Sequence, residues 1–75
     1  MKKVFIKIVE MDDVNKFAQH ARSVQGDVLV SRGKFCVDGK SILGMYSLNL
    51  SQGCTVEYPE NATEFDEFIQ QFVGE

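Results

Sequence analysis

Ser41 heads the segment of this chain that most clearly carries chemistry. The turn pair Asp38-Gly39 lies just before it, and the serine stands where a short helix over about residues 41–46 would begin. A serine at such a position can accept a hydrogen bond from a free amide of the first turn. A phosphate on its hydroxyl would meet the same amides and the positive end of the helix dipole. The pattern predicts either a simple helix cap or a regulatory phosphorylation site.

Apolar side chains crowd the residues that follow Ser41. One short helix cannot turn all of them inward, and a chain of 75 residues has a small core. Some of them should therefore face solvent or a partner protein. The apolar residues of this segment are Ile42, Leu43, Met45, Tyr46 and Leu48.

The two cysteines and the single histidine form no pattern typical of a catalytic or metal site. A zinc site would need four ligands at close paired spacing, and His20 is far from both Cys36 and Cys54 in the sequence. With no signal peptide before the first strand, we expect free thiols and a cytoplasmic protein. No Ser/His/Asp set or glycine-rich phosphate loop is present, so we expect no catalytic residues, metal or cofactor.

The composition is typical of one small globular domain, which we place over residues 1–75. The chain is 44% hydrophobic and 25% charged, which argues against disorder. Its net charge of −3 disfavours a direct role in nucleic-acid binding, which usually needs a basic cluster. No apolar run approaches the length that spans a membrane.

Alternating apolar residues and turn residues predict four short strands. Arg32-Gly33 has the composition of a hairpin turn between the second and third strands. In the fourth strand we expect Cys54, Val56 and Tyr58 to point inward. The expected strands cover about residues 3–9, 27–31, 34–38 and 54–58.

Helical spacing of apolar residues predicts three helices. The first is expected over about residues 13–24, with an aspartate of the pair Asp12-Asp13 as its cap. The second is the short helix after Ser41. The third should begin with Asn61 as cap and Glu64 as the carboxylate of a capping box. Its apolar stripe consists of Phe65, Phe68, Ile69, Phe72 and Val73.

The element order is therefore β-α-β-β-α-β-α. Helices that cover one face of an antiparallel sheet satisfy this order and the single apolar face of each strand. The sequence predicts an α+β open-faced sandwich, with a ferredoxin-like arrangement as the alternative.

Residues 40–48, which read Lys-Ser-Ile-Leu-Gly-Met-Tyr-Ser-Leu, resemble the regulatory-serine segment of the phosphocarrier protein HPr. Gln52-Gly53 follows at the spacing of that family, which belongs to the bacterial sugar phosphotransferase system. The resemblance implies strand order 1-4-2-3 and three helices on one face. It also implies that Ser41 is the residue that HPr kinase phosphorylates in Gram-positive members. Partner-binding residues carried over from the family are Lys40, Ile42, Leu43 and Tyr46.

The resemblance breaks at the start of the first helix. HPr carries phosphate there on the histidine of a Gly-x-His-x-Arg-Pro motif, where helix-start amides and the arginine hold the phosphate oxygens. This chain has Glu10-Met11-Asp12-Asp13 instead, in a loop several residues shorter. The three carboxylates would repel a phosphate donor. His20 lies about two turns further along the predicted helix.

We therefore expect a non-catalytic, HPr-like regulatory or interaction module that has lost the carrier histidine. Its expected partners are proteins, namely HPr kinase and phosphotransferase-system or catabolite-control proteins, and it should be a monomer or weak dimer. One alternative is a phosphoryl carrier that uses His20 or another atypical residue. A second is a constitutive protein-binding domain that associates through the apolar patch over residues 42–48.

Overall fold

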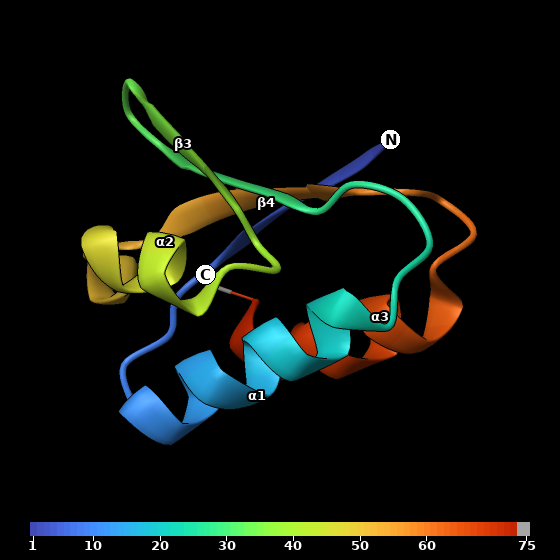
Figure 1. Cartoon of the computed structure of the whole chain (residues 1–75), viewed down its shortest axis with the longest axis horizontal. Coiled ribbons are helices and arrows are strands. Elements are labelled where there is room, and N and C mark those ends of the chain that lie inside the picture. Colours follow the sequence, from blue (N-terminus) through green and yellow to red (C-terminus); the bar gives the residue numbers. More distant parts are fainter. Residues whose placement is uncertain (74–75) are drawn as a thin grey trace.

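A four-stranded antiparallel sheet forms one layer of the molecule, and the helices gather on one of its faces (Figure 1). The computed structural model describes residues 1–73. The strands lie in the order β1-β4-β2-β3, which confirms the predicted α+β class and strand order. Their bounds are Lys2–Ile6 for β1, Leu29–Arg32 for β2, Phe35–Asp38 for β3 and Cys54–Tyr58 for β4.

Over residues 1–73, three α-helices and two 3-10 turns accompany the sheet. They are α1 (Met11–Arg22), α2 (Ile42–Ser47), η1 (Leu50–Gln52), α3 (Thr63–Ile69) and η2 (Gln70–Phe72). The prediction of an aspartate cap on the first helix is wrong. The carbonyl of Glu10 already accepts hydrogen bonds from the amides of Asp13 and Val14, so the chain is helical from Met11. Asp12 and Asp13 consequently lie within the first turn.

The start and the end of the third helix also differ from the prediction. Its N-cap is Ala62 and no side chain caps it, because a turn after Pro59 places Asn61 before the cap position. The helix ends before the predicted stripe does. The amide of Lys7 donates to the carbonyl of Phe72, and Val73 forms a bridge with Ile6 in β1. Phe72 and Val73 are thus paired with β1 and the residue that follows it.

The core lies between the inner face of the sheet and the helices. Cys54, Val56 and Tyr58 are all buried, which confirms the predicted alternation in β4. Phe65 of α3 packs edge-on against both Tyr58 and Phe17, with ring centroids 5.3 and 5.4 Å apart. Phe65 is 2% exposed, whereas Phe68 and Phe72 are only partly buried. Of the three phenylalanines on the predicted stripe, Phe65 therefore contributes most to the core.

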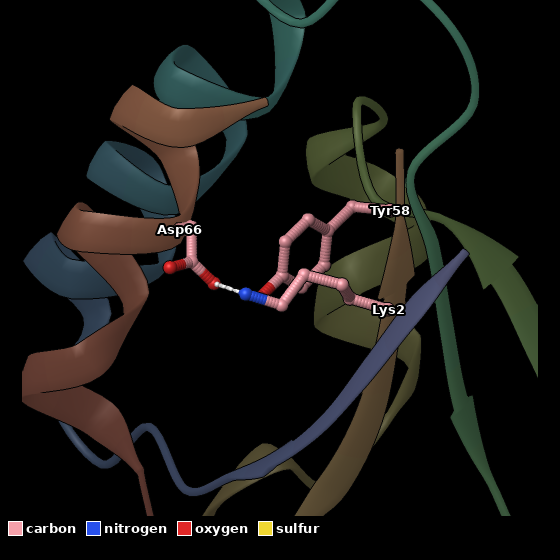
Figure 2. Close-up of polar contacts among 3 residues, drawn as sticks. All are labelled: Lys2, Tyr58 and Asp66. Carbon is pink, nitrogen blue, oxygen red and sulfur yellow. Dashed lines mark hydrogen bonds and ion pairs between the residues drawn. The ribbon is translucent and has the colours of Figure 1, made fainter. Parts of the chain in front are cut away.

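A polar network joins α3 to the two neighbouring strands β1 and β4. Figure 2 shows Lys2 and Tyr58 converging on the carboxylate of Asp66. The Tyr58 hydroxyl donates to Asp66 Oδ1, and Lys2 Nζ lies 3.0 Å from the same oxygen. These hydrogen bonds, that of Tyr58 first, lower the pKa of the Asp66 carboxyl. Burial, followed by the bond to Asp66, raises the pKa of the Tyr58 hydroxyl.

Replacing Phe65 with alanine should destabilise the fold by about 3–5 kcal/mol, because it removes a fully buried aromatic ring. The matched control is Phe35→Ala on β3, where the ring is 69% exposed and the change should stay within about 0.5 kcal/mol. Urea unfolding at neutral pH measures both values. Equal losses in the two variants would contradict the core described above.

The Asp66 network predicts a specific dependence of stability on pH. Because the folded-state pKa of Asp66 is lowered, its stabilising contribution is fully present above the unfolded value of about 3.9. It is lost as the pH falls through the lower folded-state pKa. Urea midpoints should therefore show a stability gap between wild type and Asp66→Asn at pH 6 that closes in acid. Glu67→Gln, on the exposed side of α3, is the control. A gap that stays constant with pH would refute the assignment.

Candidate functional site

Ser41 caps α2, as the sequence predicts. Its backbone is extended, with φ −100° and ψ 115°, and its hydroxyl accepts a hydrogen bond from the Gly44 amide at 3.2 Å. Its carbonyl accepts the first helical bond, from the amide of Met45. Ser41 is exposed, so the residue that caps the helix faces solvent.

Hydrogen bonds join the segment before Ser41 to the end of α1. Lys40 Nζ donates to the carbonyl of Val24 at 2.9 Å, and Arg22 Nε donates to the carbonyl of Lys40 at 3.2 Å. The Lys40 amide donates to Asp38 Oδ1. Lys40 is therefore half-buried, and its ammonium group is directed at the α1 terminus. Arg22 was not expected at this site, because its approach to Lys40 depends on tertiary packing that helical spacing does not reveal.

The apolar residues of α2 divide between the core and the surface. Met45 is fully buried, Ile42 is half-buried, Leu43 is 79% exposed and Tyr46 is 43% exposed. Gly44 lets the helix approach β3 closely, since a Cβ there would lie 3.3 Å from Val37. The structure thus brings Leu43 and Tyr46 together on the exposed side, one turn apart.

Tyr46 also connects α2 to the first half of α1. Its hydroxyl donates to Asn15 Oδ1 at 3.0 Å. Since the other end of α2 lies beside Arg22 at the end of α1, the two helices run in opposite directions. Ser41 consequently lies near the last turn of α1, and Tyr46 lies towards its first turns.

The first turn of α1 carries no group that accepts phosphate through nitrogen. Residues 7–10 form the whole connection from β1, and Asp12 and Asp13 occupy the first turn. His20, the only histidine of the chain, is in the last turn, where its ring stacks on Phe68 at 3.8 Å. It is therefore remote from the amide-rich start of the helix.

The cysteines contribute no site in the part of the chain that the structure describes. Cys36 is exposed on β3 and Cys54 is buried in β4, and both are free thiols. Burial raises the pKa of the Cys54 thiol to about 11, against a weaker opposing effect of Arg32, so the thiol stays protonated and unreactive at neutral pH. Within residues 1–73, no three metal-binding side chains converge. No helix over these residues has the length and apolar character needed to cross a membrane.

Known proteins share both the sequence pattern and the fold of this chain. The model of the family described as "PTS HPr component phosphorylation site" matches residues 11–71. A crystal structure of HPr-C-His from Thermoanaerobacter tengcongensis is 25% identical, with a TM-score of 0.78, and the match covers 95% of this chain and 93% of that one. Comparison with curated protein sequences gives no significant match.

A second crystal structure, of a phosphocarrier protein HPr from Bacillus anthracis str. Ames, supports the fold alone. It is 24% identical, with a TM-score of 0.69, over 97% of this chain and 94% of that one. HPr proteins are phosphocarriers that act with other proteins and have no catalytic set of their own. Because the family model matches most of the sequence and the strand order agrees, the chain belongs to the HPr phosphocarrier family of the sugar phosphotransferase system.

Proposed function

We propose that this chain is a non-catalytic regulatory module of the phosphotransferase system, in which phosphorylation of Ser41 controls binding to partner proteins. The observation that carries the proposal is the position of Ser41. It is an exposed helix cap, directly followed on α2 by the exposed side chains of Leu43 and Tyr46.

The surroundings of Ser41 are suited to a phosphate. The amide of Gly44 is directed at its hydroxyl oxygen, and the guanidinium of Arg22 lies against the neighbouring carbonyl. A phosphate would add about two negative charges close to this arginine, and charge-assisted hydrogen bonds to guanidinium are strong. A phosphate on Ser41 would therefore be stabilised by the Gly44 amide and the Arg22 guanidinium.

The mechanism that we infer is a local change of charge on an unchanged fold. Hydrogen bonds from Lys40 and Arg22 hold the segment before Ser41 against α1. We therefore expect a phosphate on Ser41 to leave the backbone of this segment unchanged. Leu43 and Tyr46 would supply the apolar contact, with Ile42 at its edge. Lys40 would take part by holding Ser41 in position. A partner protein would bind the phosphate and this apolar surface at the same time.

The absence of a carrier histidine supports a regulatory role over phosphoryl transport. His20 stacks on a phenylalanine at the far end of α1, and the first turn carries carboxylates that repel an anionic donor. Its imidazole has no helix-start amides around it to hold phosphate oxygens. Protein partners of the proposed module are an HPr kinase and phosphotransferase-system or catabolite-control proteins.

Incubation with ATP and an HPr kinase should add one phosphate to the intact protein. Intact-mass spectrometry measures the addition, and the phosphate should survive acid treatment, as phosphoserine does. Ser41→Ala should abolish it. Ser47→Ala should not, because Ser47 is an exposed serine of the same helix that instead donates to the Gly44 carbonyl. A protein that gains no phosphate, or gains it equally in the Ser41→Ala variant, would refute the proposal.

A further inference from the structure

The turn that joins β2 to β3 projects away from α1 and α3 (Figure 1). Its two central residues are Gly33, which has φ +59°, and Lys34, and Arg32 and Phe35 face each other across the strands on either side. β3 has no buried residue, whereas β1, β2 and β4 each bury at least one. The hairpin tip, which we define as residues 32–35, therefore lies outside the core.

Phe35 lies on the face of the sheet that the helices cover, yet its ring is exposed to solvent. Val30 and Val37 face each other across β2 and β3, and Val30 is fully buried. Because side chains two residues apart on a strand share a face, Phe35 lies on the same face as Val37. Its ring is nevertheless 69% exposed. Burial within this fold therefore does not account for an aromatic residue at this position.

Positive charge accompanies this exposed ring. Arg32, Lys34 and Phe35 line one open hollow at the hairpin tip. No acidic residue occurs between Asp27 and Asp38, and neither cation forms an ion pair within residues 1–73. Since the whole chain carries a net charge of −3 and these two residues carry +2, the rest of the chain carries −5. The hairpin tip is thus a positively charged surface on an acidic protein.

β3 also provides an open sheet edge beside these side chains. It is the last strand in the order β1-β4-β2-β3, and in the described part of the chain β2 is its one neighbour in the sheet. In an antiparallel pair, alternate residues direct their backbone N–H and C=O groups away from the neighbouring strand. Such an edge can accept an extended segment of another chain as an added strand.

We infer that the hairpin tip and the edge of β3 bind an extended acidic segment of a partner protein. The segment would pair with the backbone of β3, and its carboxylates would pair with Arg32 and Lys34. An apolar side chain of the segment would cover Phe35. The surface lies on β2 and β3, apart from the side chains of α2 that surround Ser41, and the inference needs no phosphate on that serine.

The distribution of charge selects a narrow acidic segment over a broad anionic surface. A lipid bilayer or a nucleic-acid duplex is wide enough to approach the rest of the chain as well, and its net charge of −5 would repel either one. A single nucleic-acid strand could approach the hairpin tip alone, but it has no peptide backbone to pair with the edge of β3. An extended acidic peptide satisfies both the two cations and the open edge.

Amide NMR of the unphosphorylated, full-length protein tests the inference with designed peptides. The first is a ten-residue peptide of glutamate and valine in equal number, and the second has lysine in place of every glutamate. The glutamate peptide should shift the amides of residues 32–38, and the lysine peptide should not. Equal shifts with both peptides, shifts confined to other residues, or no shifts would overturn the inference.

Three further probes distinguish strand addition from attraction by charge alone. A glutamate peptide with N-methylated backbone amides keeps every carboxylate but loses the donors that pair with β3, and it should bind at least about fivefold more weakly. Anionic phosphatidylglycerol vesicles and a ten-nucleotide strand of thymidine should bind more weakly than the glutamate peptide. Tighter binding of either one, or equal binding of the methylated peptide, would overturn the inference.

Variants of the protein separate the hairpin tip from the overall charge. The double change Arg32→Gln and Lys34→Gln should weaken binding of the glutamate peptide about fivefold, as expected for two exposed ion pairs. The matched double change of the exposed residues Lys7 and Lys16, each to Gln, alters the net charge equally and should weaken it by no more than about twofold. Phe35→Ser should weaken it about threefold, through loss of apolar contact. Equal losses in the two double variants would contradict the inference.

The outcomes also separate this inference from the proposed function. If Ser41 accepts phosphate but the glutamate peptide does not bind the hairpin tip, the inference fails and the regulatory role stands. If the peptide binds but Ser41 accepts no phosphate, the serine switch fails and the edge of β3 remains a binding surface.

Discussion

Burial of the inner face of β4 is the constraint on which the rest of this structure depends. β4 pairs with β1 on one side and β2 on the other, and its inward side chains Cys54, Val56 and Tyr58 are covered by the helices. The aromatic contact from Tyr58 through Phe65 ties α3 and α1 to this strand. With the sheet and these helices in place, α2 can only pack with Met45 inward. Ser41 and Leu43 are consequently directed outward.

The chain keeps the HPr topology although its one histidine lies in the last turn of α1. The connection from β1 to α1 spans only residues 7–10, and Asp12 and Asp13 lie in the first turn of the helix that follows, yet the strands and helices keep the HPr topology. Within this connection Ile8 lies in the core, whereas Lys7, Val9 and Glu10 are exposed. The two ends of α2 contact different parts of α1. Arg22 donates to the carbonyl of Lys40, just before Ser41, at one end, and Tyr46 donates to Asn15 at the other.

Local pattern was sufficient to predict the elements, the inward side chains of β4 and the cap at Ser41, because each depends on residues close in sequence. It failed at the two ends of the third helix, for different reasons. Pairing of Val73 with β1 is a long-range contact that shortens the helix, whereas a local turn after Pro59 displaces the expected cap at Asn61. The resemblance to HPr supplied the strand order, which periodicity alone leaves open. Neither source predicted Arg22 beside Lys40, which results from the packing of α1 against the segment before α2, or the exposure of Val9 and Met11.

We propose that this HPr fold works without a phosphohistidine. The most direct test is to incubate the chain with phosphoenolpyruvate and the phosphoryl-donor proteins of the system, and to measure its intact mass before and after acid treatment. An HPr protein with the histidine motif, treated in parallel, should gain one acid-labile phosphate. For this chain we expect no acid-labile phosphate. An acid-labile phosphate that disappears in a His20→Ala variant would contradict this expectation, because it would show that the chain carries phosphate on His20.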